Sequence, residues 1–159
     1  MSTPNLSQFL AERLRKAGQG LHSACEKMPE DRLSWKPTCE GNAGRDALDQ
    51  LLECAYLNDW FAKCLRSGQA GSVDWDDYKV QCDANRSKAA ALQWFQRATN
   101  ALADAMAAFP PDRLGDTITD SIHNAQTTWA EFAIDLFYWN TVYHEGQVNY
   151  IQVLYGDLS

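Results

Sequence analysis

The stretch from Thr127 to Gly156 constrains the fold most, because its pattern predicts one long helix. Thr128 and Glu131 have the spacing of a capping box, in which both side chains pair with backbone N–H groups of the first turn. Gly156 suits the C-terminal end because glycine adopts a left-handed backbone without steric cost. One face of this helix carries Trp129, Ala133, Leu136, Asn140, His144, Gln147, Ile151 and Leu154.

The middle of that face is polar, whereas a helix that packs against a core normally presents apolar residues there. Asn140, His144 and Gln147 are consecutive members of the face. Burying a polar group without a hydrogen-bond partner costs about 1–3 kcal/mol, so a polar run on a buried face needs a reason. We therefore expect a functional site to lie around these side chains.

Three earlier segments also show helical periodicity. They run from about Leu6 to Met28, from Arg45 to Arg66 and from Arg86 to Phe109. Longer polar connections cover residues 67–85 and 112–126, and no stretch alternates at a period of two over a convincing length. The pattern predicts an all-α single domain over residues 1–159, a four-helix bundle with up-down helices, longer connections and essentially no sheet.

The helix predicted over residues 45–66 is apolar on two sides. One face carries Leu48, Leu51, Ala55, Asn58, Ala62 and Leu65, and the opposite face carries Leu57, Trp60 and Cys64 beside Glu53 and Tyr56. No helix is central in a bundle of four, so the second apolar face predicts a contact with another copy. We therefore expect a homodimer.

The overall charge and the cysteines narrow the class of protein. The formal net charge is −7 and the pI is about 4.8, and no cluster of Lys and Arg offsets this, so we expect no nucleic-acid partner. No apolar run approaches the roughly 18 residues that span a membrane, and the N-terminus lacks the pattern of a secretory signal. Five cysteines without a CxxC pair then predict reduced thiols and a cytoplasmic protein.

Asn140 and His144 are four residues apart, so their side chains lie one above the other on the same face. A helix presents two ligands to one metal ion with this spacing. A third ligand would come from the helix over residues 45–66, where Glu53 and Cys54 are the candidates.

A pocket beside these ligands would be lined by Gln147, Tyr143 and Cys54. The same residues also allow a simpler interpretation, in which His144, Asn140 and Gln147 form a hydrogen-bonded core cluster without a ligand.

Other features favour packing or solvated positions. His22 and His123 are predicted to be surface histidines, and the acidic run at residues 74–77 lacks the spacing and distal glutamate of a calcium loop. The chain contains no GxSxG, P-loop or GxGxxG motif, so the corresponding enzyme classes have no support.

The segment NTVYHEGQVNYIQVLYG resembles the final helix of DinB-like proteins, which are grouped with YfiT-like metal-dependent hydrolases. The signature of that helix is HxxxHxGQ followed by an aromatic and aliphatic tail that ends in glycine. His144, Gly146 and Gln147 match it, and Tyr150 and Gly156 agree in character. Upstream, MPEDRLSWKP resembles the family's loop after the first helix, and ALDQLLECAYLNDWF resembles its second helix.

This resemblance implies a four-helix bundle, commonly a homodimer, in which three histidines hold a divalent metal such as zinc, nickel or iron. In this chain the corresponding positions are Glu53, Asn140 and His144, so only one histidine is kept. Some relatives use the metal to activate a low-molecular-weight thiol for transfer or isomerisation.

Three hypotheses follow. The chain is a metal-dependent thiol S-transferase or hydrolase that uses Glu53, Asn140 and His144. Alternatively, it is a stress-related dimer that binds a small molecule and has lost the metal, with Glu53 bonded to His144 and Asn140. In the third hypothesis the three side chains are a sealed structural cluster. The incomplete set of histidines favours the second hypothesis.

Overall fold

Helices make up most of the chain, as the all-α prediction requires. This computed structural model describes residues 5–39 and 42–157. The helices are α1 (Leu6–Lys27), α2 (Glu30–Leu33), α3 (Ala47–Ser67), α4 (Trp75–Ala84), α5 (Lys88–Ala108), α6 (Trp129–Phe132) and α7 (Trp139–Leu154), with a 3₁₀ turn η1 (Pro111–Arg113) and a π-helical segment η2 (Ala133–Tyr138). The strands are β1 (Thr38–Cys39), β2 (Asn42–Ala43), β3 (Thr117–Asp120) and β4 (Ala125–Thr128). No helix in the described part of the chain is long and apolar enough to cross a membrane.

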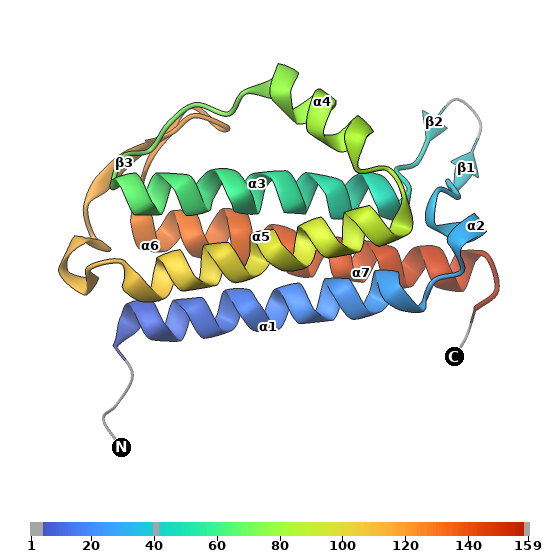
Figure 1. Cartoon of the computed structure of the whole chain (residues 1–159), viewed down its shortest axis with the longest axis horizontal. Helices are drawn as coiled ribbons and strands as arrows, with labels where there is room; N and C mark the ends of the chain where they lie inside the picture. The colour runs from blue at the N-terminus through green and yellow to red at the C-terminus, as the bar shows by residue number, and fades with distance from the viewer. Residues whose placement is uncertain (1–4, 40–41, 158–159) are drawn as a thin grey trace.

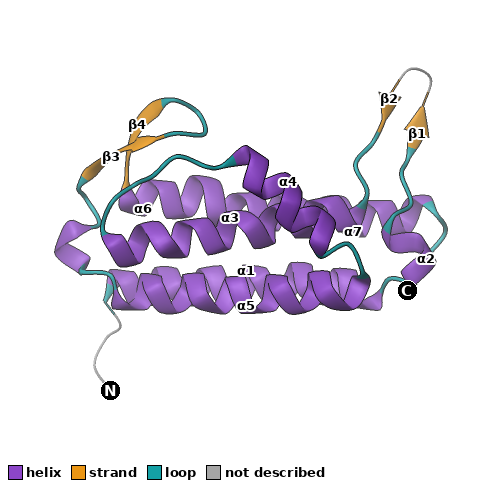
Figure 2. Ribbon diagram, turned by 45° about the horizontal axis from the view of Figure 1, so that its top comes forward, coloured by secondary structure: helices purple, strands orange, loops and turns teal. Residues whose placement is uncertain are grey.

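The long helices lie side by side, and α6, η2 and α7 follow one another as a single rod (Figures 1 and 2). Helix α1 packs against α5 and α7, and α3 packs against the same two helices. Fully buried side chains from each helix, including Leu21, Leu51, Phe95 and Val148, meet between them. Burial of this apolar surface is the main force that holds the helices together.

Side-chain caps mark where the long helices begin. The side chains of Asn5, Asp46, Ser87 and Thr128 each accept a hydrogen bond from a backbone N–H of the first turn. Thr128 and Glu131 form the predicted capping box. The predicted bounds of the first three helices agree with α1, α3 and α5 to within about two residues at each end.

Both predicted connections contain regular structure. Residues 67–85 include α4, which lies across α3 (Figure 2). The sequence pattern predicted a longer polar connection here and did not predict this helix. Residues 117–128 form an antiparallel hairpin in which β3 pairs with β4, and β1 pairs with β2 in a shorter one. The prediction of essentially no sheet therefore missed these hairpins. In β4 the side chains are exposed or half-buried, and the sequence AQTT shows no alternation between apolar and polar positions.

The last helix is continuous but not α-helical throughout. The π-helical segment η2 places an additional residue in the turn, so the buried face after it differs from the predicted one. Phe137, Thr141 and Val148 are buried, whereas Leu136, Asn140 and Gln147 are only half-buried at the edge of the core. His144 belongs to both the predicted and the observed buried face. The predicted C-terminal glycine is also present, with Gly156 at a φ of 95°.

The second apolar face of α3 is covered within the chain. Tyr56 contacts Tyr78 of α4 with ring centroids 5.3 Å apart, and Trp60 packs against Phe132 and Phe137. Helix α4 and the start of the last helix therefore bury the face from which the sequence predicts a dimer contact. A dimer would need a different surface.

Candidate functional site

His144 is the centre of the polar cluster. Helix α7 points its side chain towards α3, where it is 3% exposed. Its Nδ1 atom lies 2.9 Å from Oε1 of Gln50 and 2.9 Å from Oε1 of Gln147, and its Nε2 atom lies 3.3 Å from Oε1 of Glu53. The buried imidazole thus has an acceptor at each nitrogen, which removes the cost of an unpaired polar group.

Glu53 joins His144 to a cation at the surface. Its Oε2 atom lies 2.6 Å from Nη1 of Arg45, which precedes the Asp46 cap of α3. Burial raises the pKa of Glu53, but the hydrogen bond from His144 and the charge of Arg45 outweigh this and lower the pKa to about 2. Glu53 is therefore an ionised carboxylate at neutral pH.

Both nitrogens of His144 face hydrogen-bond acceptors. Nδ1 faces two amide oxygens and Nε2 faces an ionised carboxylate, and each of these groups accepts a hydrogen bond. Both ring nitrogens are therefore already engaged by neighbouring side chains.

Asn140 contacts the other candidate ligand of α3. Its Nδ2 donates a hydrogen bond to Sγ of Cys54 over 3.8 Å. Cys54 is buried, and this burial, together with the charge of Glu53, raises the pKa of the thiol well above its usual range. Of the two predicted third ligands, Glu53 reaches His144, and Cys54 remains a neutral thiol beside Asn140.

Tyr143 lies at the outer edge of the cluster. Its ring stacks on Trp139 with centroids 4.9 Å apart and lies 5.6 Å from the imidazole of His144. Since Tyr143 is 46% exposed, it borders the cluster rather than enclosing it. Gln147 is half-buried and belongs to the hydrogen-bonded group itself.

The donor set does not fit a divalent cation. Both nitrogens of His144 are engaged by side chains of the cluster, and the guanidinium of Arg45 pairs with Glu53 where it would repel a metal ion. Asn140 turns its amide N–H towards sulfur. Within residues 5–39 and 42–157, no group of three or more His, Cys, Asp or Glu side chains could hold a metal ion.

Sequence reasoning missed two members of the cluster, Arg45 and Gln50. Gln50 precedes Glu53 by three residues, so the two side chains lie on the same side of α3, and this spacing was an available signal in the sequence. In the structure Gln50 is 2% exposed. Arg45 lies outside the helix, and its pairing with Glu53 depends on how the chain enters α3. No periodicity marks it.

The two histidines that were predicted to lie at the surface, His22 and His123, are away from the His144 cluster. His123 is exposed and pairs through Nδ1 with Oδ2 of Asp120 at 2.6 Å, in the turn of the β3–β4 hairpin. His22 is half-buried on α1, with Nδ1 3.9 Å from Oε2 of Glu26. Both interactions are local to their own elements.

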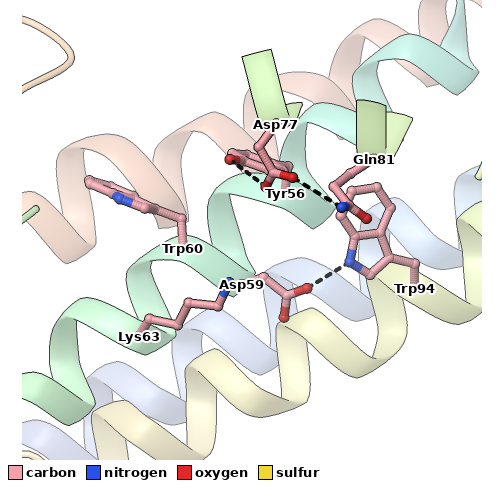
Figure 3. Close-up of a pocket in the computed structure, with 7 residues that line it drawn as sticks. All are labelled: Tyr56, Asp59, Trp60, Lys63, Asp77, Gln81 and Trp94. Atoms are coloured by element: carbon pink, nitrogen blue, oxygen red, sulfur yellow. Dashed lines mark hydrogen bonds between the residues drawn. The ribbon is translucent and has the colours of Figure 1, made fainter. Parts of the chain in front are cut away.

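A separate cavity of about 220 Å³ lies where α3, α4 and α5 meet (Figure 3). Two of its carboxylates already accept hydrogen bonds from its aromatic residues: Trp94 donates to Asp59 over 2.6 Å, and Tyr56 donates to Asp77 over 3.1 Å. Its polar groups thus serve to dock α4 and α5 on α3.

No protein-family model matches the chain, and no curated protein matches it either.

Proposed function

We propose that this chain is a DinB-like four-helix-bundle protein whose metal site has become a metal-free ion cluster, and that it acts as a stress-related, small-molecule-binding homodimer. The HxGQ segment around His144 supports the family, and the side-by-side arrangement of α1, α3, α5 and the last helix supports the bundle.

One observation carries the proposal. Glu53, at a position where the resemblance implies a metal-binding histidine, forms an ion pair with Arg45 and a hydrogen bond with His144. A guanidinium supplies the positive charge that a metal ion would supply in a three-histidine site. The amide oxygens of Gln50 and Gln147 each lie 2.9 Å from Nδ1 of His144 and complete its hydrogen bonding.

The state of the nucleophiles and bases favours binding over catalysis. A general base needs a free lone pair, and both nitrogens of His144 face acceptors. A nucleophilic cysteine needs a thiolate, and burial raises the pKa of the Cys54 thiol. The groups that remain accessible are the half-exposed guanidinium of Arg45 and the ring of Tyr143.

These accessible groups suit a small molecule that carries an anionic group. A low-molecular-weight thiol with carboxylates is a molecule of this kind. Arg45 offers charge-assisted hydrogen bonds to a carboxylate. The exposed ring of Tyr143, which lies 5.6 Å from the imidazole of His144, offers an apolar surface at the edge of the same cluster.

The dimer surface is assigned to one side of α7. Large apolar side chains are exposed there at helical spacing, and we call Trp139, Tyr143, Gly146, Tyr150 and Val153 the α7 stripe. Contiguous exposed apolar surface favours a protein partner. A Cβ atom added at Gly146 would meet no atom within 4 Å, so the centre of the stripe is open to a close approach by a second copy.

Metal content tests the first part of the proposal. Protein purified without tag or chelator, then dialysed against zinc, should contain far less than one metal ion per chain by mass spectrometry of the digested sample. The double variant Glu53→His, Asn140→His rebuilds three histidines and should bind about one zinc ion per chain. About one zinc, nickel or iron per wild-type chain, lost in His144→Ala, would instead establish the metal-dependent thiol transferase or hydrolase.

Ligand binding tests the second part, with reduced glutathione as the probe in an NMR titration. We expect shifts of signals from residues around Tyr143 and Gln147, and an affinity that falls about tenfold in Arg45→Met, because one charged hydrogen bond is worth about 1.5–3 kcal/mol. Arg97→Met changes an exposed arginine on α5 and should bind as wild type does. No saturable shift at millimolar glutathione would reject this ligand class.

A further inference from the structure

A groove runs between α1 and the last helix, on the side away from α3. It consists of two adjoining cavities that share Arg13 and Tyr138. The first, of about 230 Å³, is apolar and is lined by Phe9, Leu10, Leu14, Ala133 and Ile134. The second, of about 300 Å³, has a mixed lining that includes the charged side chains of Lys16 and Glu145, together with Ala17, Gly20 and Val142. The groove therefore changes from apolar to charged along α1.

Among the described residues, the cations of the groove form no ion pair, although Glu145 lines the same cavity. Nε of Arg13 is buried and has no hydrogen-bond partner within the described residues. Neither Arg13 nor Lys16 has an ion pair in that part of the chain, whereas Arg15 on the same helix pairs with Asp104 at 2.9 Å. Buried polar atoms in folded proteins are almost always satisfied, so an unpaired guanidinium nitrogen in an acidic protein needs an explanation.

Arg13 is held at the junction of the two cavities. Its guanidinium carbon lies 5.2 Å from the centre of the Phe9 ring, a cation–π geometry that keeps the charge next to the apolar end. Phe9 and Ile134 are both about half exposed, so that end is open. A ligand with a charged head beside an apolar tail would match this order of groups.

Two local features shape the groove. Ala133, Ile134 and Tyr138 belong to η2, and π-helical turns are common at functional sites because they displace side chains from the α-helical register. At the other end, a Cβ atom at Gly20 would collide with the carboxylate of Glu145, so glycine lets this acid close against α1. Glu145 thus lines the second cavity next to Gly20.

We propose that this groove binds an amphipathic carboxylate, with the carboxylate on Arg13 and Lys16 and an unbranched apolar tail against Phe9, Leu14 and Ile134. The site is separate from the cluster around His144 and does not depend on its function. Paired hydrogen bonds from the outer nitrogens of a guanidinium suit a planar carboxylate.

Sodium octanoate is the probe, with binding followed by NMR of the isotope-labelled full chain. We expect saturable shifts at Gly20, Val142 and the residues of η2. Butanoate should bind more than tenfold more weakly because it lacks most of the tail. Octanol and octylamine should also bind at least tenfold more weakly because neither places a negative charge on Arg13.

Variants separate the head group from nonspecific apolar binding. Arg13→Met should weaken octanoate about tenfold or more, and Arg13→Lys should restore part of the affinity because it keeps the charge. Arg15→Met, the matched change on the opposite side of α1, should leave the affinity unchanged. Failure of octanoate to bind, equal affinity for octanol, or equal loss in Arg13→Met and Arg15→Met would each overturn the proposal.

Discussion

The charge of Glu53 acts through two neighbours at once. Oε2 pairs with Arg45 and Oε1 accepts from His144, and together they keep the carboxylate ionised although it is mostly buried. Removing one member of a buried charged group leaves the others unpaired, which costs more than the pair contributes. The three residues thus act as one unit in stability.

Glu53→Gln should remove a stabilisation that depends on pH. The folded-state pKa of about 2 lies below the usual value of 4.5, so the contribution of Glu53 is complete above about pH 4.5 and is lost as pH falls towards 2. We expect the variant to be about 1–3 kcal/mol less stable than wild type at pH 7, and the difference to shrink below pH 4.5. Urea unfolding followed by tryptophan fluorescence at several pH values measures this.

Glu12→Gln changes an exposed carboxylate on α1 and is the control, with an expected effect within about 0.5 kcal/mol. If the Glu53→Gln difference stays constant from pH 7 to pH 2, the charge of Glu53 does not stabilise the fold.

Among the elements, α1 and α5 make a close contact at Gly18. A Cβ atom at this position would collide with the methyl group of Thr99. The hydroxyl of Thr99 meanwhile accepts a hydrogen bond from Nδ2 of Asn58 over 3.1 Å. Three helices therefore meet at one small residue, and the spacing of α1 and α5 depends on the missing side chain.

Gly18→Ala should destabilise the fold by about 1–3 kcal/mol, despite the higher helix propensity of alanine, because the packed site must expand. Adding Thr99→Ser removes the colliding methyl group and keeps the hydroxyl for Asn58, so the double variant should recover most of the loss. Chemical denaturation of the three proteins tests this.

Gly146→Ala is the matched control because a Cβ there meets open space. At protein concentrations low enough for a monomer it should be neutral or stabilising by up to about 1 kcal/mol. A double variant no more stable than Gly18→Ala would show that the methyl group of Thr99 does not limit the approach of the helices.

On the scale of the whole molecule, one apolar helix face is covered by other parts of the chain and another is exposed. The second face of α3 is covered by α4 and by aromatic residues of the last helix. The α7 stripe stays exposed, next to the polar cluster at Tyr143. A dimer through the stripe would therefore border the proposed small-molecule site as well as bury apolar surface.

Light scattering at tens of micromolar should give about twice the 17.9-kDa chain mass for wild type. Tyr150→Lys should give a monomer, because it places a charge in the α7 stripe. Val80→Lys on α4 is the control, since Val80 and Tyr150 are both 63% exposed. A wild-type mass of one chain at this concentration would remove the dimer from the proposal.

Parts of the site followed from helical spacing alone. Asn140, His144 and Gln147 share a side of the last helix in the structure, and Glu53 reaches His144 as one of the two predicted partners. The register of the apolar residues before them did not follow, because η2 changes the number of residues per turn and buries Phe137 in place of Leu136.

The sequence by itself determined the helical class, the positions of the long helices and the polar interruption on the last one. Caps and a 3.6-residue period are local properties, so they can be recognised without knowing what packs where. Only the tertiary structure decided that Arg45 pairs with Glu53, that α4 covers α3 and that Arg13 lies unpaired in a groove. Those outcomes depend on which faces of distant segments meet, and that is settled by packing of the whole chain.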